Sequence, residues 1–137
     1  MKTILVLCTG NSCRSQIAEG YLRYYAGEKA VIYSAGIETH GVNPMAVATM
    51  KADGIDISGQ TSNNVNEYKD LAVDYVITVC DNANEHCPIF PAAAKKFHHN
   101  FPDPAKATGS AEDIARQFAN VRDQIKAYAQ QFVQDHL

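Results

Sequence analysis

The segment from Cys8 to Ser15 reads Cys-Thr-Gly-Asn-Ser-Cys-Arg-Ser and has the side chains best suited to chemistry. It follows an apolar run and precedes residues with helical spacing, so we expect its backbone N–H groups to surround a tetrahedral oxyanion at a helix N-terminus. The guanidinium of Arg14 can bind two oxygens of such an anion at once. Arg14 and the helix N-terminus should also lower the pKa of Cys8. The sequence therefore predicts a nucleophilic thiolate beside a bound oxyanion.

The other residues of this segment, which we call the cysteine loop, should shape the binding site. Gly10 allows a sharp turn, Asn11 can brace the loop from within, and Ser15 can donate a hydrogen bond to the Cys8 thiolate. Cys13 could face the anion, but a side chain turned into the core beneath the helix fits its position at least as well. We predict that these residues bind the oxyanion: Thr9, Gly10, Asn11, Ser12, Cys13, Arg14 and Ser15.

Cys80 and Cys87 form a second pair of thiols, seven positions apart. This spacing differs from that of zinc-binding pairs and from the Cys-x-x-Cys redox motif, so we predict no metal site. If residues 81–87 form two helical turns, the thiols lie about 10 Å apart along the axis, whereas a disulfide needs Cα atoms within about 7 Å. Joining them then requires the segment to uncoil, which predicts a mobile redox element.

Asp103 lies between two prolines, after an expected strand, so a stiff loop holds its carboxyl group. Taken together with the cysteine loop, this position predicts a general acid; the alternative is a solvated aspartate in a turn. The five histidines are interpreted as surface or satisfied polar residues: His40, His86, His98, His99 and His136.

The expected elements alternate between strand and helix. Apolar strands are expected at residues 3–7, 30–34, 72–79 and 95–101, and helices before Gly27, from Pro44 to Gly54 and from a Ser110 cap to Phe132. This order predicts an α/β fold, a parallel sheet with helices on both faces. Ligands of such sheets bind at the carboxyl ends of the strands. Cys8 and Cys80 occupy two such ends, so we expect them to converge on one site.

The composition bounds the class of protein. At 137 residues and 46% hydrophobic, the chain suits one domain over residues 1–137. Its net charge of -3, without a block of Lys or Arg, argues against nucleic acid as a partner. It shows neither a signal peptide nor a run of about 18 apolar residues, so no membrane partner is expected. We therefore expect a cytoplasmic protein whose four cysteines stay reduced.

Several segments together resemble the thioredoxin-coupled arsenate reductases, which share their fold with the low-molecular-weight protein tyrosine phosphatases. The similar segments are CTGNSCRSQIAEG at 8–20, YSAGIETHGVNP at 33–44, GIDIS at 54–58, TVCDNANEHCPIFP at 78–91, DPA at 103–105 and VRDQIK at 121–126. The resemblance covers nearly the whole chain. It implies a single low-molecular-weight phosphatase-like domain with a four-stranded parallel sheet.

The resemblance also implies a reaction. Cys8 would attack the arsenic of arsenate, with Arg14 and the loop amides holding the oxygens and Asp103 protonating the departing hydroxide. Cys80 would then attack Cys8 and release arsenite, and Cys87 would attack Cys80 to bring the disulfide to the surface. The implied partners are arsenate as substrate and reduced thioredoxin as electron donor. We expect a monomer with no tightly bound cofactor.

Some members of this family are similar in binding a potassium ion near the loop. Asn11, Glu19, Ser34 and Thr61 match the positions that surround it. Asn63, however, stands where an aspartate is expected, so the site lacks one formal charge. We therefore assign no metal ligands in this chain, and its potassium dependence stays an open question for the sequence.

Two other functions compete with reduction. A phosphotyrosine phosphatase could use the same loop and aspartate to form and hydrolyse a phosphocysteine. That chemistry leaves Cys80 and Cys87 unexplained, and residues 105–108, Ala-Lys-Ala-Thr, lack the tyrosines that the phosphatases resemble one another in carrying there. We expect only a weak side activity on aryl phosphates. A non-catalytic thiol sensor would not need the nucleophile, the anion loop and the acid together.

Overall fold

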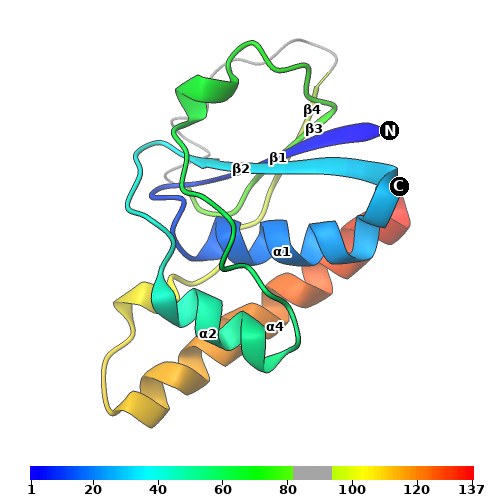
Figure 1. Cartoon of the computed structure of the whole chain (residues 1–137). Coiled ribbons are helices and arrows are strands. Elements are labelled where there is room, and N and C mark those ends of the chain that lie inside the picture. The colour runs from blue at the N-terminus through cyan, green and yellow to red at the C-terminus, as the bar shows by residue number, and fades with distance from the viewer. Residues whose placement is uncertain (82–93) are drawn as a thin grey trace.

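The computed structural model describes residues 1–81 and 94–137. Its strands are β1 (Lys2–Cys8), β2 (Ala30–Gly36), β3 (Tyr75–Thr78) and β4 (Lys95–His98). They form a four-stranded parallel sheet in the order β2-β1-β3-β4 (Figure 1). β1 is central and apolar, and its residues 4–7 are fully buried. The predicted four-stranded parallel α/β fold is confirmed.

Two strands are shorter than predicted. The third was expected at residues 72–79 and the fourth at 95–101, but β3 spans Tyr75–Thr78 and β4 ends at His98. Asp74 lies just before β3, and its carboxylate accepts a hydrogen bond from the N–H of Thr3 at 2.8 Å. This side-chain contact holds the chain where it enters the sheet. Beyond β4, the chain leaves the ladder before Pro102, whose ring provides no N–H donor.

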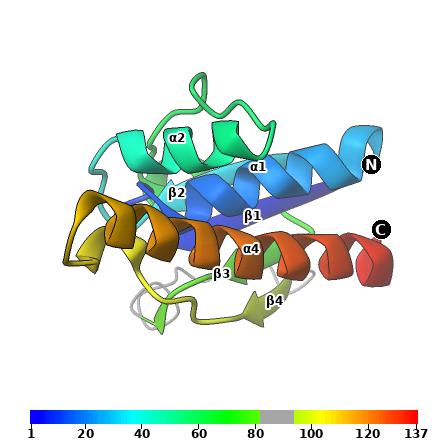
Figure 2. The same cartoon turned by 90° about the horizontal axis from the view of Figure 1, so that it is seen from below.

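Helical segments lie on both faces of the sheet, and the three α-helices of the described residues share one face (Figure 1). The α-helices α1 (Arg14–Ala26), α2 (Pro44–Ala52) and α4 (Ala111–His136) gather on one face, where α1 and α4 lie side by side (Figures 1 and 2). On the opposite face the short 3-10 helix η2 (Val65–Tyr68) packs against β2, with the rings of Tyr33 and Tyr68 5.3 Å apart. Two further 3-10 turns follow α1 and Asp103: η1 (Gly27–Lys29) and η3 (Pro104–Lys106).

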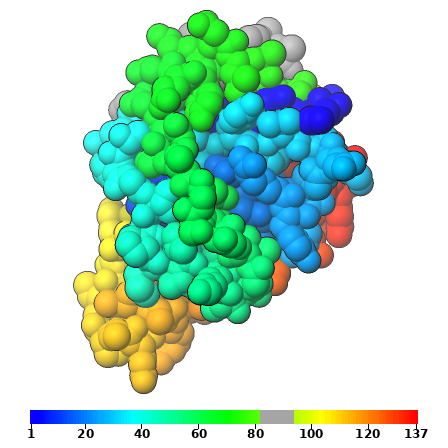
Figure 3. Space-filling model, viewed as in Figure 1, coloured from blue at the N-terminus to red at the C-terminus, as the bar shows by residue number. Residues whose placement is uncertain are grey.

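Local signals in the sequence explain the helix ends. Ser110 caps α4 through a reciprocal pair of hydrogen bonds with Asp113, as the predicted cap requires. Pro44 is the first residue of α2, where a missing N–H costs nothing, and Asn43 caps that helix. The apolar stripe predicted for the last helix comprises Ile114, Phe118, Val121, Ile125, Tyr128 and Phe132; Ile114 and Tyr128 are half-buried and the other four are buried, as are Ala129 and Val133 beside them. The loop before α4 and its first turns project from the body of the molecule (Figure 3).

The sheet order decides where the chemistry can occur. Because β1 and β3 are adjacent and parallel, their carboxyl ends lie at the same edge. Cys8 ends β1 and Cys80 follows β3 by two residues, so both thiols reach that edge, as predicted. Within the described part of the chain, no helix is long and apolar enough to span a membrane.

Candidate active site

The carbonyl groups of the cysteine loop point away from its concave side. Four of them accept backbone N–H groups of the segment 37–43, in the pairs Ile37 to Cys8 (3.3 Å), Glu38 to Thr9 (3.0 Å), His40 to Gly10 (3.0 Å) and Asn43 to Ser12 (3.1 Å). The Asn11 carbonyl accepts from Gln16 Nε2 at 2.9 Å. In a trans peptide the C=O and the next N–H point in opposite directions, and no described peptide bond is cis. The N–H groups of residues 9–13 are therefore directed inward, as an anion site requires.

Asn11 braces the loop from inside the protein. It is fully buried and has a φ of 48°, a left-handed conformation that asparagine tolerates better than most residues. Its Nδ2 donates to Ser15 Oγ at 2.8 Å and to Ser34 Oγ at 2.9 Å, while its Oδ1 accepts the N–H of Asn63 at 2.8 Å. One side chain thus ties the loop to α1, to β2 and to the segment before η2.

A pocket of about 280 Å³ lies on the concave side of the loop. This volume is at the lower end of ligand sites and suits a small ion better than an extended organic molecule. The pocket is lined by Cys8, Thr9, Gly10, Ser12, Cys13, Arg14, His40, Asp103, Ala105 and Lys106. The structure thus brings the predicted nucleophile, arginine and carboxyl group to one cavity.

Arg14 is held by the segment that follows β4. Its Nη1 donates to the carbonyl of Phe101 at 3.0 Å, and its Nη2 lies 3.7 Å from Asp103 Oδ2. The Phe101 side chain is buried and packs against the rings of His99 and Tyr128, which fixes that carbonyl. The guanidinium has further N–H groups for an anion, since arginine carries five.

Asp103 faces the pocket from the start of η3. Its Oδ1 accepts the N–H of Ala105 at 3.0 Å, which caps the 3-10 turn. Its Oδ2 is the oxygen nearest to Arg14. The side chain is 24% exposed, so it reaches both the pocket and solvent while one oxygen is fixed by the Ala105 N–H. This placement suits the predicted general acid.

The Cys8 thiol has a raised pKa, so the expectation of a lowered pKa was wrong for this arrangement. The largest cause is a hydrogen bond with the Cys80 thiol, and burial adds to it. Arg14 and the N–H of Thr9 act in the predicted direction, but their combined effect is smaller. The sequence predicted that Cys80 lies near Cys8, but the effect of the Cys80 thiol on the pKa of Cys8 was not considered. Two adjacent thiols retain protons that one isolated thiol beside arginine would lose.

Cys80 lies directly against the cysteine loop. Its side chain is only 3% exposed, and its sulfur is 3.3 Å from Thr9 Oγ1. Cys80 therefore contacts both Thr9 and, through a thiol–thiol hydrogen bond, the nucleophile Cys8. The contact with Thr9 was not predicted, because only the folded chain shows which loop atom meets the end of β3.

Cys13 combines the two alternatives considered from the sequence. Its side chain is buried in the core cluster, yet it also lines the pocket. Burial, followed by the Asp103 carboxylate, raises the pKa of this thiol to about 11. At neutral pH it is therefore protonated and a poor nucleophile.

His40 was interpreted as a surface or satisfied polar residue and is exposed, but its place at the pocket was not predicted. It lines the pocket, and its ring covers Gly10 so closely that a Cβ there would lie 2.5 Å from His40 Nδ1. Lys106, in η3, lines the same pocket and was also missed. One signal was available for His40: it follows β2, whose carboxyl end lies beside that of β1. Cys87 and His86, with the helix and the mobility predicted over 81–87, lie outside the described residues.

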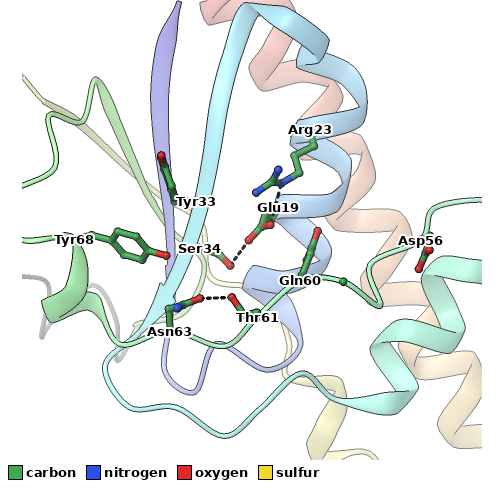
Figure 4. A pocket seen from close by; sticks show the side chains of 10 residues that line it. Glu19, Arg23, Tyr33, Ser34, Asp56, Gln60, Thr61, Asn63 and Tyr68 are labelled. Carbon is green, nitrogen blue, oxygen red and sulfur yellow. Dashed lines mark hydrogen bonds and ion pairs between the residues drawn. The ribbon is translucent and has the colours of Figure 1, made fainter.

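A second cavity, of about 330 Å³, lies among α1, β2, η2 and the segment that precedes η2 (Figure 4). It is lined by Glu19, Arg23, Tyr33, Ser34, Asp56, Gly59, Gln60, Thr61, Asn63 and Tyr68. Glu19, Ser34 and Thr61, three of the positions that matched the potassium site in the sequence comparison, therefore lie around one cavity, together with Asn63. Thr61 Oγ1 donates to Asn63 Oδ1 at 2.7 Å, so the amide oxygen of Asn63 already accepts a hydrogen bond.

The oxygens around this cavity are already engaged by protein groups. Glu19 accepts a hydrogen bond from Ser34 Oγ at 2.6 Å, and its other oxygen forms a 2.9 Å ion pair with Arg23 Nε. Asn11 Oδ1 accepts the N–H of Asn63. Potassium needs oxygens with free lone pairs and gains from negative charge; here Arg23 already neutralises the Glu19 carboxylate. The residues present do not fit a potassium ion. Elsewhere in residues 1–81 and 94–137, no group of three or more His, Cys, Asp or Glu side chains could hold a metal.

Known proteins are similar to this chain in sequence and in fold. The family model of the low molecular weight phosphotyrosine protein phosphatases matches residues 3–136. An arsenate reductase from Halalkalibacterium halodurans is 50% identical over 124 residues, which are 90% of this chain and 89% of that protein. Two solved structures, of an arsenate reductase in a phosphate-binding state and of one in an oxidized state, are 31% and 30% identical, with TM-scores of 0.80 and 0.85 and 98% of both chains covered in each case. The chain therefore belongs to the low molecular weight phosphotyrosine protein phosphatase family, in the group that includes the arsenate reductases.

Proposed function

We propose that this protein reduces arsenate to arsenite. The observation that carries the proposal is the second thiol: Cys80 is buried against Cys8 and against the loop that would hold the anion. A phosphatase needs one nucleophilic thiol, whereas reduction of arsenate consumes two electrons and oxidises two thiols. The relatives named as arsenate reductases support the same choice.

The first step joins arsenic to the protein. Arsenate would be held by the inward N–H groups of the loop and by Arg14, and the Cys8 sulfur would attack arsenic. An S–As bond forms and an As–O bond breaks; the proton of the Cys8 thiol passes to Asp103 in the same pocket, and Asp103 donates it to the departing hydroxide, which leaves as water. Arsenic remains pentavalent in this adduct.

The second step transfers the electrons. The Cys80 sulfur attacks the Cys8 sulfur and its proton passes to the oxygens of the departing arsenite, so an S–S bond forms while the S–As bond breaks. The electron pair of the S–As bond stays with arsenic, which leaves as trivalent arsenite, and the two thiols are oxidised to a disulfide. The buried contact between the two sulfurs supports this step, since thiolate exchange requires direct access.

Regeneration would use the third thiol and a protein reductant. Cys87 would attack Cys80 and free Cys8, and thioredoxin would reduce the resulting Cys80–Cys87 disulfide. A cytoplasmic monomer suits this cycle, because a reducing compartment maintains the thioredoxin pool. The pocket also supports a weak side activity on aryl phosphates, since Cys8, Arg14 and Asp103 suffice for a phosphocysteine.

The test compares two reactions of the same protein. Thioredoxin-dependent NADPH oxidation with arsenate reports the three-thiol cycle, and hydrolysis of p-nitrophenyl phosphate reports the Cys8 chemistry alone. Cys80→Ser should abolish the first and spare the second. Loss of both to the same degree in a folded variant, or of neither, would overturn the relay. A wild-type protein inactive in both assays would instead favour the thiol sensor.

A further inference from the structure

His98, at the end of β4, uses both ring nitrogens to bridge the two sides of Cys80. Its Nδ1 lies 2.7 Å from Thr78 Oγ1, and its Nε2 lies 2.8 Å from Asp81 Oδ1. Thr78 ends β3 two residues before Cys80, and Asp81 follows Cys80 directly. One imidazole therefore fixes the chain on both sides of the second thiol.

The hydrogen bonds can be satisfied in either protonation state of His98. An ionised Asp81 only accepts, so Nε2 carries a hydrogen. In the neutral ring Nδ1 accepts from the Thr78 hydroxyl. In the imidazolium Nδ1 donates to that hydroxyl, which can then donate to the Phe97 carbonyl at 3.3 Å. The bridge thus does not depend on one tautomer.

This Thr-His-Asp chain is not a hydrolytic triad. The Thr78 side chain is fully buried in the sheet, and neither His98 nor Asp81 lines the active-site pocket. A nucleophile must be able to reach the substrate, and this hydroxyl cannot. The group can act only on the chain that it holds.

Backbone contacts hold the same short segment. The N–H of Val79 donates to the Leu7 carbonyl at 2.9 Å, and the N–H of Phe101 donates to the Val79 carbonyl at 3.1 Å. The N–H of Asp81 donates to Asn100 Oδ1 at 3.2 Å. Before Cys80 the hold is a buried backbone ladder. After Cys80 the chain is held by polar contacts of Asp81: its N–H donates to Asn100, and its largely exposed carboxylate pairs with His98.

We propose that His98 is a positioning residue for the second thiol: through Thr78 and Asp81 it holds Cys80 against Cys8 for the attack that forms the disulfide. The inference rests on the proposed function, because that attack is the second step described above. The bond made is Cys8–Cys80, the bond broken is S–As, and the electron pair passes to arsenic. His98 touches neither the anion nor the reacting sulfurs in this scheme.

The experiment separates placement of Cys80 from anion binding. All variants carry Cys87→Ser, so that oxidation stops at Cys8–Cys80. His98→Phe keeps an aromatic ring but removes both nitrogens, and Thr78 can still donate to Phe97. Rapid quench, alkylation and mass spectrometry give the rate of disulfide formation in one turnover with arsenate. Titration calorimetry gives the affinity for inorganic phosphate.

We expect His98→Phe to slow disulfide formation by about 10- to 100-fold, the usual cost of a displaced reacting group. Phosphate affinity should stay within about twofold, because the loop is untouched. Asp81→Ala should match His98→Phe, and the double variant should be no slower than the slower single one. Asp81→Asn, which keeps the acceptor oxygen, is the matched control and should restore most of the rate.

Several outcomes would overturn the proposal. A wild-type rate in His98→Phe would show that the bridge does not position Cys80. An equal loss of rate and phosphate affinity would indicate collapse of the whole site, and so would a slow Asp81→Asn. Diamide, which oxidises thiols without arsenate, distinguishes failure of the proposed function. If the Cys87→Ser parent forms the Cys8–Cys80 disulfide with diamide but not with arsenate, the proposed arsenate reduction is wrong. The positioning role is then tested with diamide alone: it holds if His98→Phe forms the disulfide more slowly than its parent, and it is wrong if the two rates are equal.

Discussion

The hydroxyl of Thr9 lies 3.3 Å from the sulfur of Cys80, so the loop of the first nucleophile touches the second thiol. Thr9 comes directly after β1, and Cys80 comes shortly after the adjacent parallel strand β3. The contact is thus a product of the sheet order, which brings the ends of neighbouring parallel strands to one edge. The same sheet order brings the thiols of Cys8 and Cys80 together, so the protonation state of one affects the pKa of the other.

Replacing Cys80 with Ala should lower the pKa of Cys8, because the Cys80 thiol is the largest cause of its elevation. Arg14 and the Thr9 N–H then remain to favour the thiolate. The pH dependence of Cys8 alkylation by iodoacetamide, followed by mass spectrometry, measures the change. Its midpoint should move to lower pH in Cys80→Ala, and to higher pH in Arg14→Gln. An unchanged midpoint in Cys80→Ala would contradict the assigned cause.

Replacing Arg14 with Lys should weaken phosphate binding by about 10- to 100-fold, since a charge-assisted hydrogen bond contributes roughly 1.5–3 kcal/mol. A lysine has one point of charge and cannot donate to the Phe101 carbonyl while presenting a planar fork to the anion. Titration calorimetry with inorganic phosphate gives the affinity. Arg122→Lys is the matched control, because Arg122 donates to the Thr49 carbonyl away from the pocket. Equal effects of the two changes would remove the special role of Arg14.

Asp103→Asn should slow arsenate reduction by about 100-fold, the lower range for loss of a general acid. The amide oxygen can still accept the N–H of Ala105, so the start of η3 is preserved. A pre-steady-state assay should place the loss in formation of the Cys8 adduct. Phosphate affinity should not fall, because the substitution removes a negative charge from the pocket. A rate near that of the wild type would show that solvent supplies the proton.

The elements that sequence analysis predicted well are those whose signal is local. The α4 stripe and its Ser110 cap repeat within a few residues, and the apolar run of β1 is bounded by the loop that follows it. The convergence of Cys8 and Cys80 was also predictable, because it needs only a parallel sheet.

Contacts between separate segments were not predictable in the same way. His98 was interpreted as a surface or satisfied polar residue, and it is exposed with both ring nitrogens hydrogen-bonded, but its partners Thr78 and Asp81 are set by the register of β3 against β4. The pKa of Cys8 depends on whether its sulfur forms a hydrogen bond with the sulfur of Cys80. That contact is set by the distance between the two folded strand ends, which the spacing of residues in the sequence does not specify. His40 reached the pocket because Gly10 leaves room for its ring.

The ion pair of Glu19 and Arg23 leads to the last prediction, that the melting temperature does not depend on potassium. Glu19 is the buried member of the pair, and Arg23 already supplies its positive charge at 2.9 Å. Exchange of sodium for potassium at constant ionic strength should leave the melting temperature of the wild type unchanged. Arg23→Ala should cost roughly 1–3 kcal/mol of stability, because a buried carboxylate would lose its charged partner.

Arg116→Ala is the matched control, since Arg116 pairs with the exposed Asp113 on the surface of α4. That change should cost less than about 1 kcal/mol, as exposed pairs do. If the Glu19 carboxylate then needs another cation, potassium should stabilise Arg23→Ala more than sodium does, with no such difference in Arg116→Ala. A rise in the melting temperature of the wild type with potassium would contradict the assignment, because it would show an ion bound beside Glu19 despite the guanidinium.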